Sequence, residues 1–313
     1  MNKLDSSITS IFPTASIHNN DAWPWKEHEK ILPSLMPNGQ PWPKITVVTP
    51  SYNQGKYIEE TIRSILLQGY PNLEYIIMDA GSTDQTLDII KKYSAWITYW
   101  ESKPDRGQSH AINKGFSRAS GDIFAWLNSD DYYLPNALYH IANSYIKNKQ
   151  SYWVGVGSAK RIDGKGRLEM IHVPTATTFQ KLIDWDKYWF MQPACFFSAA
   201  IWKDHGILDE DLHLAMDFEL WLRFSKQVDF TLVDQVLCVN RNYNETKTRS
   251  MRGESIAEGR VIQFRYGGEE EAKRSIAEYV NQTQEALKLW NILASFPGRK
   301  FVQKIFSFFN KKK

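Results

Sequence analysis

Short apolar runs of strand length alternate with amphipathic segments through the first half of the chain. The runs predict four strands, over residues 45–49, 73–79, 97–101 and 123–127. The amphipathic segments predict four helices, over residues 56–68, around residues 87–90 with a cap at Thr83 or Asp84, over residues 108–119 and over residues 135–147. Strands alternating with helices predict an α/β fold, with a mostly parallel sheet and helices on both faces. The carboxyl ends of such strands share one edge, where ligands bind.

The second half of the chain is more mixed. Its apolar runs predict strands over residues 152–158 and 166–173 around a turn at Asp163 and Gly164, over residues 193–198 and over residues 230–239. Helical spacing predicts a helix over residues 216–225 and two helices within residues 254–294, separated near Gly267 and Gly268.

Both ends of the chain differ from the middle. Residues 1–43 are polar at first and then rich in Trp and Pro, which predicts an extended arm laid over the main domain, with roughly the first 20 residues loose. Residues 299–313 carry six positive charges, no acid and several Phe side chains, so they predict a basic amphipathic helix. Such a helix fits peripheral contact with an anionic membrane surface. A terminal helix docked on its own domain, or a frayed tail, is the alternative.

Composition narrows the class of protein. With 313 residues, of which 42% are hydrophobic and 23% charged, the chain is not fibrous or largely disordered. The net charge of +3 gives no sign of nucleic-acid binding. Cys195 and Cys238 are too few for a disulfide framework or a zinc cluster, so we expect free thiols in a reducing cytoplasm. The start of the chain lacks the apolar core of a signal peptide, and no run of about 18 apolar residues predicts a membrane-spanning helix.

Acidic side chains follow two of the predicted strands. Asp79 ends the second strand, and Asp130 and Asp131 follow the fourth. Because carboxylates close together repel one another, the cluster predicts a cation. Oxygen ligands without Cys or His favour Mg²⁺ or Mn²⁺, which commonly bind substrate phosphates. The alternative is that Asp130 and Asp131 only cap the next helix. The chain has neither G-x-G-x-x-G after its first strand nor a P-loop, which disfavours a nicotinamide dehydrogenase and a P-loop kinase.

Two stretches carry a family resemblance. They are residues 48–86, VTPSYNQGKYIEETIRSILLQGYPNLEYIIMDAGSTDQT, and residues 104–131, PDRGQSHAINKGFSRASGDIFAWLNSDD. Both resemble the family-2 glycosyltransferases of the GT-A fold, in the bacterial branch that builds surface polysaccharides. The resemblance covers roughly residues 44–250.

The resemblance implies an inverting glycosyltransferase that uses Mn²⁺ or Mg²⁺. Its donor would be a nucleotide-diphosphate sugar, with UDP as the expected nucleotide, and its acceptor a glycan or a lipid-linked glycan. Residues 44–135 would form the nucleotide-binding half, residues 136–250 the acceptor and catalytic half, and residues 251–313 C-terminal helices with the basic tail. The enzyme would work in the cytoplasm, with the tail at the inner face of the membrane.

Individual positions carry over by the same resemblance. The donor nucleotide would contact Thr49, Pro50, Tyr52, Asn53, Asp79, Arg106, Asn113, Asn128 and Ser129. Asn128 to Asp131 match the metal-binding D-x-D motif with Asn in place of its first Asp, so Asp130 and Asp131 would hold the metal. Ala80 replaces the second acid of the usual Asp-Asp-Gly-Ser.

The second half of the chain would supply the catalytic base. Asp217, at the start of the predicted helix 216–225, matches the base, and Glu219 is a supporting acid or the runner-up. The residues expected near the diphosphate or acceptor are Gln192, Arg241, Tyr243 and Lys247. Met191 and Tyr243 stand where the family often has His.

Several alternatives stay open at this point. One is a non-catalytic module that binds sugar nucleotides, and another is a nucleotidyltransferase, although the chain lacks a Gly-rich, Arg-containing loop after its first strand. The aromatic side chains that either stack on a sugar or belong to the core are Trp185, Tyr188, Trp189 and Phe190.

Overall fold

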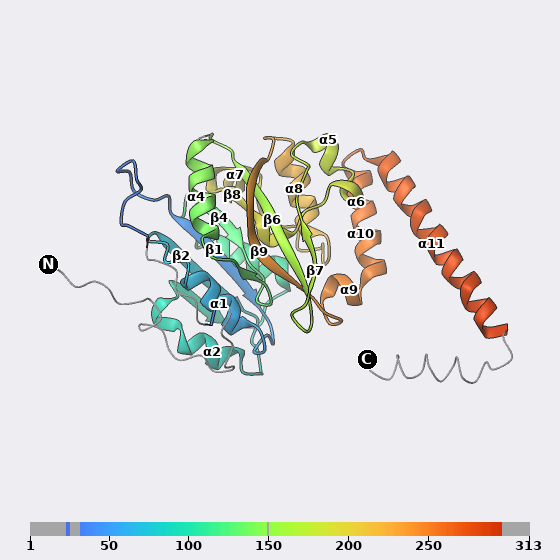
Figure 1. Cartoon of the computed structure of the whole chain (residues 1–313), viewed down its shortest axis with the longest axis horizontal. Coiled ribbons are helices and arrows are strands. Elements are labelled where there is room, and N and C mark those ends of the chain that lie inside the picture. Colours follow the sequence, from blue (N-terminus) through green and yellow to red (C-terminus); the bar gives the residue numbers. More distant parts are fainter. Residues whose placement is uncertain (1–22, 26–31, 149, 296–313) are drawn as a thin grey trace. The chain divides into compact units, whose positions relative to one another are not determined.

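The computed structural model describes residues 23–25, 32–148 and 150–295. The chain divides into two compact units, residues 1–259 and residues 260–313, and each is described by itself. The first unit is built on one nine-stranded sheet with helices on both faces (Figure 1).

Half of the sheet is parallel. Its strands follow the order β3-β2-β1-β4, and all three pairings between them are parallel. Their bounds are β1 (Ile45–Ser51), β2 (Leu73–Asp79), β3 (Tyr99–Ser102) and β4 (Ile123–Trp126). The four apolar runs of the first half therefore form the four predicted strands, and their carboxyl ends meet at one edge.

The other half of the sheet has mixed directions. It continues β4-β8-β6-β9-β5, with β7 paired to the far part of β6. β8 is antiparallel to β4 and β6, β6 is parallel to β9, and β5 is antiparallel to β9. The bounds are β5 (Tyr132–Tyr133), β6 (Val154–Asp163), β7 (Leu168–His172), β8 (Cys195–Ser198) and β9 (Thr231–Asn242). The sheet as a whole is thus more mixed than the sequence predicted.

Helices cover both faces of the sheet. The apolar core on one face contains side chains of α1 (Ile58–Leu66), α2 (Thr86–Lys92) and α4 (Ala137–Lys147). The other face carries α3 (Gln108–Phe116), α7 (Ala199–His205) and α8 (Met216–Ser225), joined through aromatic contacts such as Trp126 with Trp221. Gly115 lets α3 approach the sheet closely, since a Cβ there would lie 2.5 Å from Cγ1 of Val48.

Some boundaries differ from those predicted. α4 begins two residues after Pro135 because Asn136 has φ 63°, outside the helical region. Gln85 is the residue before α2, although the Asp84 carboxylate accepts a 2.9 Å hydrogen bond from the Thr86 N–H. A 3₁₀ turn over Gln192–Ala194 delays β8 to Cys195. Short helices that the sequence did not predict are α5 (Phe179–Leu182), α6 (Trp185–Tyr188), α7 and α9 (Lys247–Ser250).

The described part of the N-terminal arm packs on the first unit. The buried Trp23 indole donates a 2.8 Å hydrogen bond to the carbonyl of Tyr133. The buried Arg63 donates to the carbonyls of Pro24 and Trp25 at 3.2 and 3.4 Å. The Trp/Pro-rich segment thus satisfies polar groups of the domain as well as burying apolar surface. The expectation for the first 20 residues falls outside the described part of the chain.

The C-terminal helices are α10 (Arg252–Arg265) and α11 (Glu269–Ser295). They are separated at Gly267, which has φ 86°, so two helices parted at this position agree with the sequence. No helix among the described residues is long and apolar enough to cross a membrane. The basic tail 299–313 lies outside the described residues. Cys195 and Cys238 are both buried free thiols.

Candidate functional site

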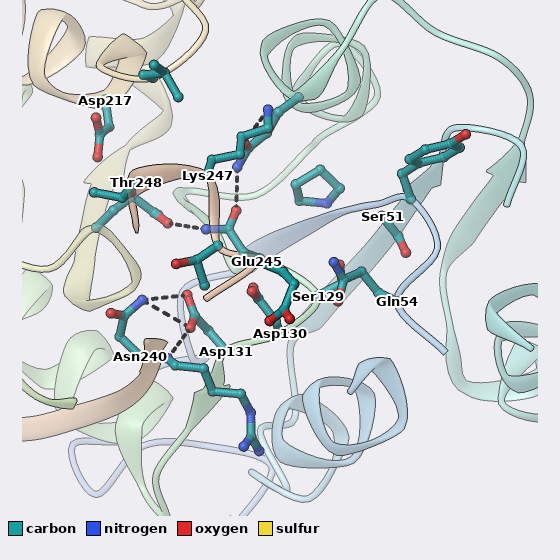
Figure 2. Close-up of a pocket in the computed structure, with 18 of the residues that line it drawn as sticks. Ser51, Gln54, Ser129, Asp130, Asp131, Asp217, Asn240, Glu245, Lys247 and Thr248 are labelled. Atoms are coloured by element: carbon teal, nitrogen blue, oxygen red, sulfur yellow. Dashed lines mark hydrogen bonds between the residues drawn. The ribbon is translucent and has the colours of Figure 1, made fainter. Parts of the chain in front are cut away.

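A cavity of about 1010 Å³ lies at the edge where the parallel strands end (Figure 2). Its walls come from the end of β1, the residues after β2 and β4, the segment before α3, the start of α8 and residues 240–252. This is the edge at which the sequence predicted a ligand.

Asp131 is buried at the end of the loop after β4, immediately before β5. Its Oδ1 accepts the Arg241 N–H at 2.9 Å, and its two oxygens lie 3.1 and 3.2 Å from Nδ2 of Asn240 (Figure 2). Burial and the neighbouring Asp130 charge raise the pKa of Asp131 well above its usual range. The carboxylate therefore fastens the end of β9 to the loop between β4 and β5.

Asp130 faces the same cavity. Its Oδ2 accepts a 2.8 Å hydrogen bond from the phenol of Tyr243, whose ring packs on Tyr57 with centroids 5.1 Å apart. Burial raises the pKa of Asp130, while the phenol opposes that rise. Tyr243, which stands where the family often has His, thus orients the Asp130 carboxylate.

The donor set suits a hard divalent cation. The Asp130 charge disfavours the ionised form of the buried Asp131 beside it, and a cation between the two acids removes that cost. Within the described residues no third His, Cys, Asp or Glu side chain joins them. Water and substrate phosphate would then complete the coordination, as is usual for Mg²⁺.

A chain of amide side chains crosses the floor of the cavity. Gln192 Nε2 donates to the Trp126 carbonyl at 2.9 Å, and Asn128 Nδ2 lies 3.4 Å from Gln192 Oε1. Gln108 Nε2 donates to Asn128 Oδ1 at 2.8 Å, and Lys247 Nζ lies 3.4 Å from Gln108 Oε1. The chain holds Asn128 as a neutral hydrogen-bonding group beside the two acids.

Asp217 occupies the first turn of α8 and faces the cavity apart from the acid pair (Figure 2). Its Oδ1 accepts a 2.8 Å hydrogen bond from the Phe218 N–H. Burial, with a contribution from the Glu258 charge, raises the pKa of Asp217 to about 6. A carboxylate with that pKa is ionised at neutral pH yet holds a proton better than an ordinary Asp, which suits a general base.

Glu258 fixes the segment that leads into Asp217. Its carboxylate accepts hydrogen bonds from the N–H groups of His213, Leu214 and Ala215 at 2.8, 2.7 and 2.5 Å. Three consecutive amides bound by one carboxylate form a rigid turn directly before α8. The sequence analysis missed Glu258, because nothing near it in the chain distinguishes it from other acids on a helix.

Three comparisons with known proteins bear on this site. The model of Glycosyl transferase family 2 matches residues 46–204, half of the chain. The chain belongs to glycosyltransferase family 2. An uncharacterized glycosyltransferase of Rickettsia typhi is 27% identical over 213 residues, 66% of this chain and 67% of the relative.

Other relatives match a smaller share of their own length. One of Rickettsia felis is 26% identical over 67% of this chain but 36% of the relative. The putative teichuronic acid biosynthesis glycosyltransferase TuaG of Bacillus subtilis is 34% identical over 142 residues, 44% of this chain and 56% of TuaG.

Solved structures share the fold of this glycosyltransferase. Residues 1–349 of S. aureus TarS in complex with UDP-GlcNAc align with a TM-score of 0.56 at 22% identity, covering 70% of this chain and 65% of that one. The mannosyltransferase PcManGT of Pyrobaculum calidifontis, in complex with GDP-Man and Mn²⁺, gives a TM-score of 0.54 at 18% identity and covers 86% and 88%. Together with the sheet and its helices, these likenesses confirm the GT-A fold.

Most of the predicted site residues of the glycosyltransferase line the cavity. They are Pro50, Tyr52, Asn128, Ser129, Asp130, Asp131, Gln192, Asp217, Arg241, Tyr243 and Lys247. Arg241 also forms an ion pair with Glu60 and lies over the rings of Tyr57 and Tyr132, which neutralises part of its charge. Lining residues to which the sequence analysis gave no role include Gln54, Arg161, Glu169, Asn240 and Arg252.

The other predicted site residues are not among those that line the cavity: Thr49, Asn53, Asp79, Arg106, Asn113 and Glu219. Asp79 accepts hydrogen bonds from Ser82 and Ser102 hydroxyls at 2.5 and 2.6 Å, which shape the loop after β2. Asn53 Oδ1 accepts the Thr83 N–H at 2.9 Å. Their predicted contacts with a donor stay predictions.

Outside the cavity, three predicted site residues make contacts within α8 or with the segment before it: Arg106, Asn113 and Glu219. Arg106 donates two hydrogen bonds to Glu210 at 2.9 and 2.6 Å, and the Asn113 amide exchanges hydrogen bonds with the backbone of Leu208. Glu219 is buried and binds Arg223 at 2.7 Å. In this structure Glu219 is committed to that pair, which leaves Asp217 as the acid that faces the cavity.

Three of the four aromatic side chains before the 3₁₀ turn, Trp185, Trp189 and Phe190, pack against the core. None of Trp185, Tyr188, Trp189 and Phe190 is among the residues that line the cavity. Trp185 packs on Phe218 with centroids 4.9 Å apart, and Phe190 packs on Trp221 at 5.6 Å. Direct stacking of a sugar on these rings has no support in the described geometry.

Proposed function

We propose that the protein is an inverting, divalent-cation-dependent glycosyltransferase of polysaccharide biosynthesis that works in the cytoplasm. It transfers a sugar from a nucleotide-diphosphate sugar, with UDP as the expected nucleotide, to a hydroxyl of a glycan or lipid-linked acceptor. One observation carries the proposal. Asp217, whose pKa is raised to about 6, lines the same cavity as Asp130 and the buried Asp131.

The chemistry needs one displacement. Asp217 takes the proton of the acceptor hydroxyl as its oxygen forms a bond to the anomeric carbon. The bond from that carbon to the diphosphate breaks on the opposite face, so the configuration inverts and the nucleoside diphosphate leaves with the electron pair. The mechanism requires no second nucleophilic carboxylate, and Glu219 is bound to Arg223.

The leaving diphosphate needs positive charge. Asp130 and Asp131 would hold the cation, which when bound supplies charge that stabilises the leaving group. Lys247 lines the same cavity and adds positive charge from the segment after β9, while Arg241, at the end of β9, also lines it with a charge that Glu60 partly neutralises. The ligands in the TarS and PcManGT structures, UDP-GlcNAc and GDP-Man with Mn²⁺, support a nucleotide-diphosphate sugar as the class of donor.

A thermal-shift panel tests the donor site. UDP-, GDP-, dTDP- and CMP-sugars are each added with Mn²⁺, with Mg²⁺ and with EDTA. A ligand at 100 times its Kd stabilises the folded protein by about 2.7 kcal/mol, so we expect a clear shift for one nucleotide in the presence of the cation. A shift that survives EDTA, or no shift with any nucleotide, contradicts the proposal.

A variant of the base tests catalysis separately from binding. We expect Asp217→Asn to bind the donor as the wild type does and to lose transfer by orders of magnitude. Equal turnover in Asp217→Asn removes Asp217 as the base. Donor binding without turnover in the wild type, with any of a range of glycan acceptors, favours the non-catalytic module instead.

A further inference from the structure

Arg161 brings a positive charge into the cavity that the proposed reaction does not use. It lies on β6 opposite Asn240 of β9, the residue that binds Asp131. The Arg161 guanidinium lies 5.1 Å from the centre of the Trp189 ring. A planar guanidinium on an indole face is held in orientation by both stacking and cation–π attraction.

Trp189 is itself fixed, so the platform under Arg161 is rigid. The His172 imidazole stacks on the Trp189 ring with centroids 3.9 Å apart. The same imidazole lies within hydrogen-bond distance of the Trp189 carbonyl, with Nε2 at 2.7 Å. Strand β7, which carries His172, thus positions the Arg161 guanidinium through Trp189.

Arg161 forms no hydrogen bond and no ion pair with the described residues. Its Nε is buried and makes no hydrogen bond. Burial lowers the pKa of Arg161, and the charges of Glu169 and Asp131 oppose that fall. Both acids have other hydrogen-bond partners: Oε2 of Glu169 accepts from Asn242 at 2.8 Å, and Asp131 accepts from the Arg241 N–H. A guanidinium without a directly bonded acceptor is costly, so an anion that reached its exposed nitrogens would relieve that cost.

Two more cations line the same cavity, on the segment after β9. Arg249 and Arg252 belong to the cavity wall, and neither forms an ion pair within the residues that the structure describes. Arg241 differs from them because Glu60 neutralises it. The cavity therefore offers unpaired arginines in addition to Lys247, the cation assigned to the diphosphate.

We propose that Arg161, on its Trp189 platform, binds a carboxylate or phosphate group carried by one of the two substrates. That group belongs either to an acidic acceptor glycan or to the transferred sugar, for example a uronic acid. The guanidinium fork would bind two oxygens of the group side by side. The inference rests on the proposed function, because it names the chemical class of that same site's substrates.

Calorimetry on the full chain tests the anion site directly. The protein is first saturated with UDP and Mg²⁺ and then titrated with glucuronate, methyl phosphate and, as the neutral comparison, glucose. We expect the two anions to bind and glucose not to bind. Arg161→Met should weaken anion binding by about 10-fold or more, and Arg161→Lys, which keeps the charge without the fork, should fall between. Equal anion binding in Arg161→Met and the wild type overturns the proposal.

The control variant is Arg118→Met. The Arg118 guanidinium also lies over an aromatic ring, 4.2 Å from the centre of Tyr99, but Arg118 is not among the residues lining the cavity. We expect Arg118→Met to bind the anions as the wild type does. The affinity for UDP should be equal in all variants, and a loss of UDP affinity in Arg161→Met would assign Arg161 to the diphosphate and overturn the proposal.

The donor arm identifies which substrate carries the anion. UDP-glucuronate and UDP-glucose are titrated against the wild type and Arg161→Met with Mg²⁺. A preference for UDP-glucuronate that disappears in Arg161→Met assigns the group to the transferred sugar, and equal binding of both donors assigns it to the acceptor. If the wild type binds no UDP compound, the proposed function is contradicted but the anion site is not. Titration of the anions in the absence of nucleotide then still tests whether Arg161 binds them.

Discussion

The phenol of Tyr243 donates a 2.8 Å hydrogen bond to Oδ2 of Asp130 from 113 positions further along the chain. The contact joins the loop after β4 to the segment after β9. It also gives Tyr243 a different role from the metal ligand that the family often has there. The phenol orients the carboxylate that we propose as a metal ligand and donates its own proton to it.

Removing this hydroxyl should weaken cation binding. We expect Tyr243→Phe to raise the Mn²⁺ concentration needed for half-maximal activity by about 10-fold, because partners that orient a ligand carboxylate contribute to metal affinity. Titration of activity with Mn²⁺ at saturating donor measures the effect. The control is Tyr152→Phe, which removes a 2.7 Å phenol–carboxylate contact to Asp204 outside the cavity. An unchanged Mn²⁺ requirement in Tyr243→Phe would show that the phenol does not orient Asp130.

The pH dependence of transfer should report the base. Because the pKa of Asp217 is raised to about 6, we expect kcat/KM to fall as pH drops through about 6. The ionised, buried carboxylate also destabilises the fold above that pH. Asp217→Asn should therefore raise the free energy of unfolding at pH 8 by on the order of 2 kcal/mol, and the gain should fade below pH 6 as the wild-type carboxyl takes up its proton. Urea titrations of both proteins at pH 8 and pH 5 measure the gain. A difference in unfolding free energy between Asp217→Asn and the wild type that is the same at both pH values contradicts the prediction.

Glu258 should act on Asp217 through the turn before α8. We expect Glu258→Ala to lower kcat by about 10-fold or more while the Kd of the donor stays unchanged, because three amides lose their acceptor and the base loses its position. Glu258→Gln keeps an acceptor but removes a nearby negative charge, so the acid limb of the pH profile should move to lower pH. Glu254→Ala, at an exposed position of the same helix, is the control. If the acid limb of the pH profile does not move in Glu258→Gln, the Glu258 charge does not influence the pKa of Asp217.

Asn128 keeps the charge of the proposed metal site lower than a third carboxylate would. We expect Asn128→Asp to bind Mn²⁺ without donor about 10-fold more tightly, since a third carboxylate joins Asp130 and Asp131. Without metal the same variant should melt at a lower temperature than the wild type because three carboxylates repel one another. Asn143→Asp makes the same charge change on α4, outside the cavity lining, and should alter neither property. Mn²⁺ calorimetry and melting with EDTA measure both, and unchanged Mn²⁺ affinity would remove Asn128 from the metal site.

Local patterns predicted the elements whose burial is decided within one segment. The strands of the parallel half read as continuous apolar runs, and helix α8 has the predicted bounds of residues 216–225. β5 was missed because its two residues become a strand only by pairing with β9, far along the chain. The strands of the second half were predicted, but their directions were not, because each direction is set by the distant strand that lies alongside.

The candidate site divides in a similar way. Asp130 and Asp217 follow from short motifs, and the structure places both in one cavity. Glu258 and Arg161 carry no local signal, because their importance comes from three backbone amides and from an indole ring that folding brings to them. Arg106 shows the converse, since a motif position is occupied by a side chain that the fold pairs with Glu210.

The buried contact between Asp131 and the Arg241 N–H should couple cation binding to the ordering of the segment after β9. Arg241 lies at the end of β9, just before the segment that carries Tyr243 and Lys247 over the cavity. A cation bound to Asp130 and Asp131 would change the charge on the carboxylate that anchors this segment. By linkage, if the cation favours the ordered segment, the ordered segment raises the affinity for the cation by the same factor. Bound cation should therefore protect residues 243–250 from proteolysis, and a cross-link that holds the segment in place should raise the affinity for the cation.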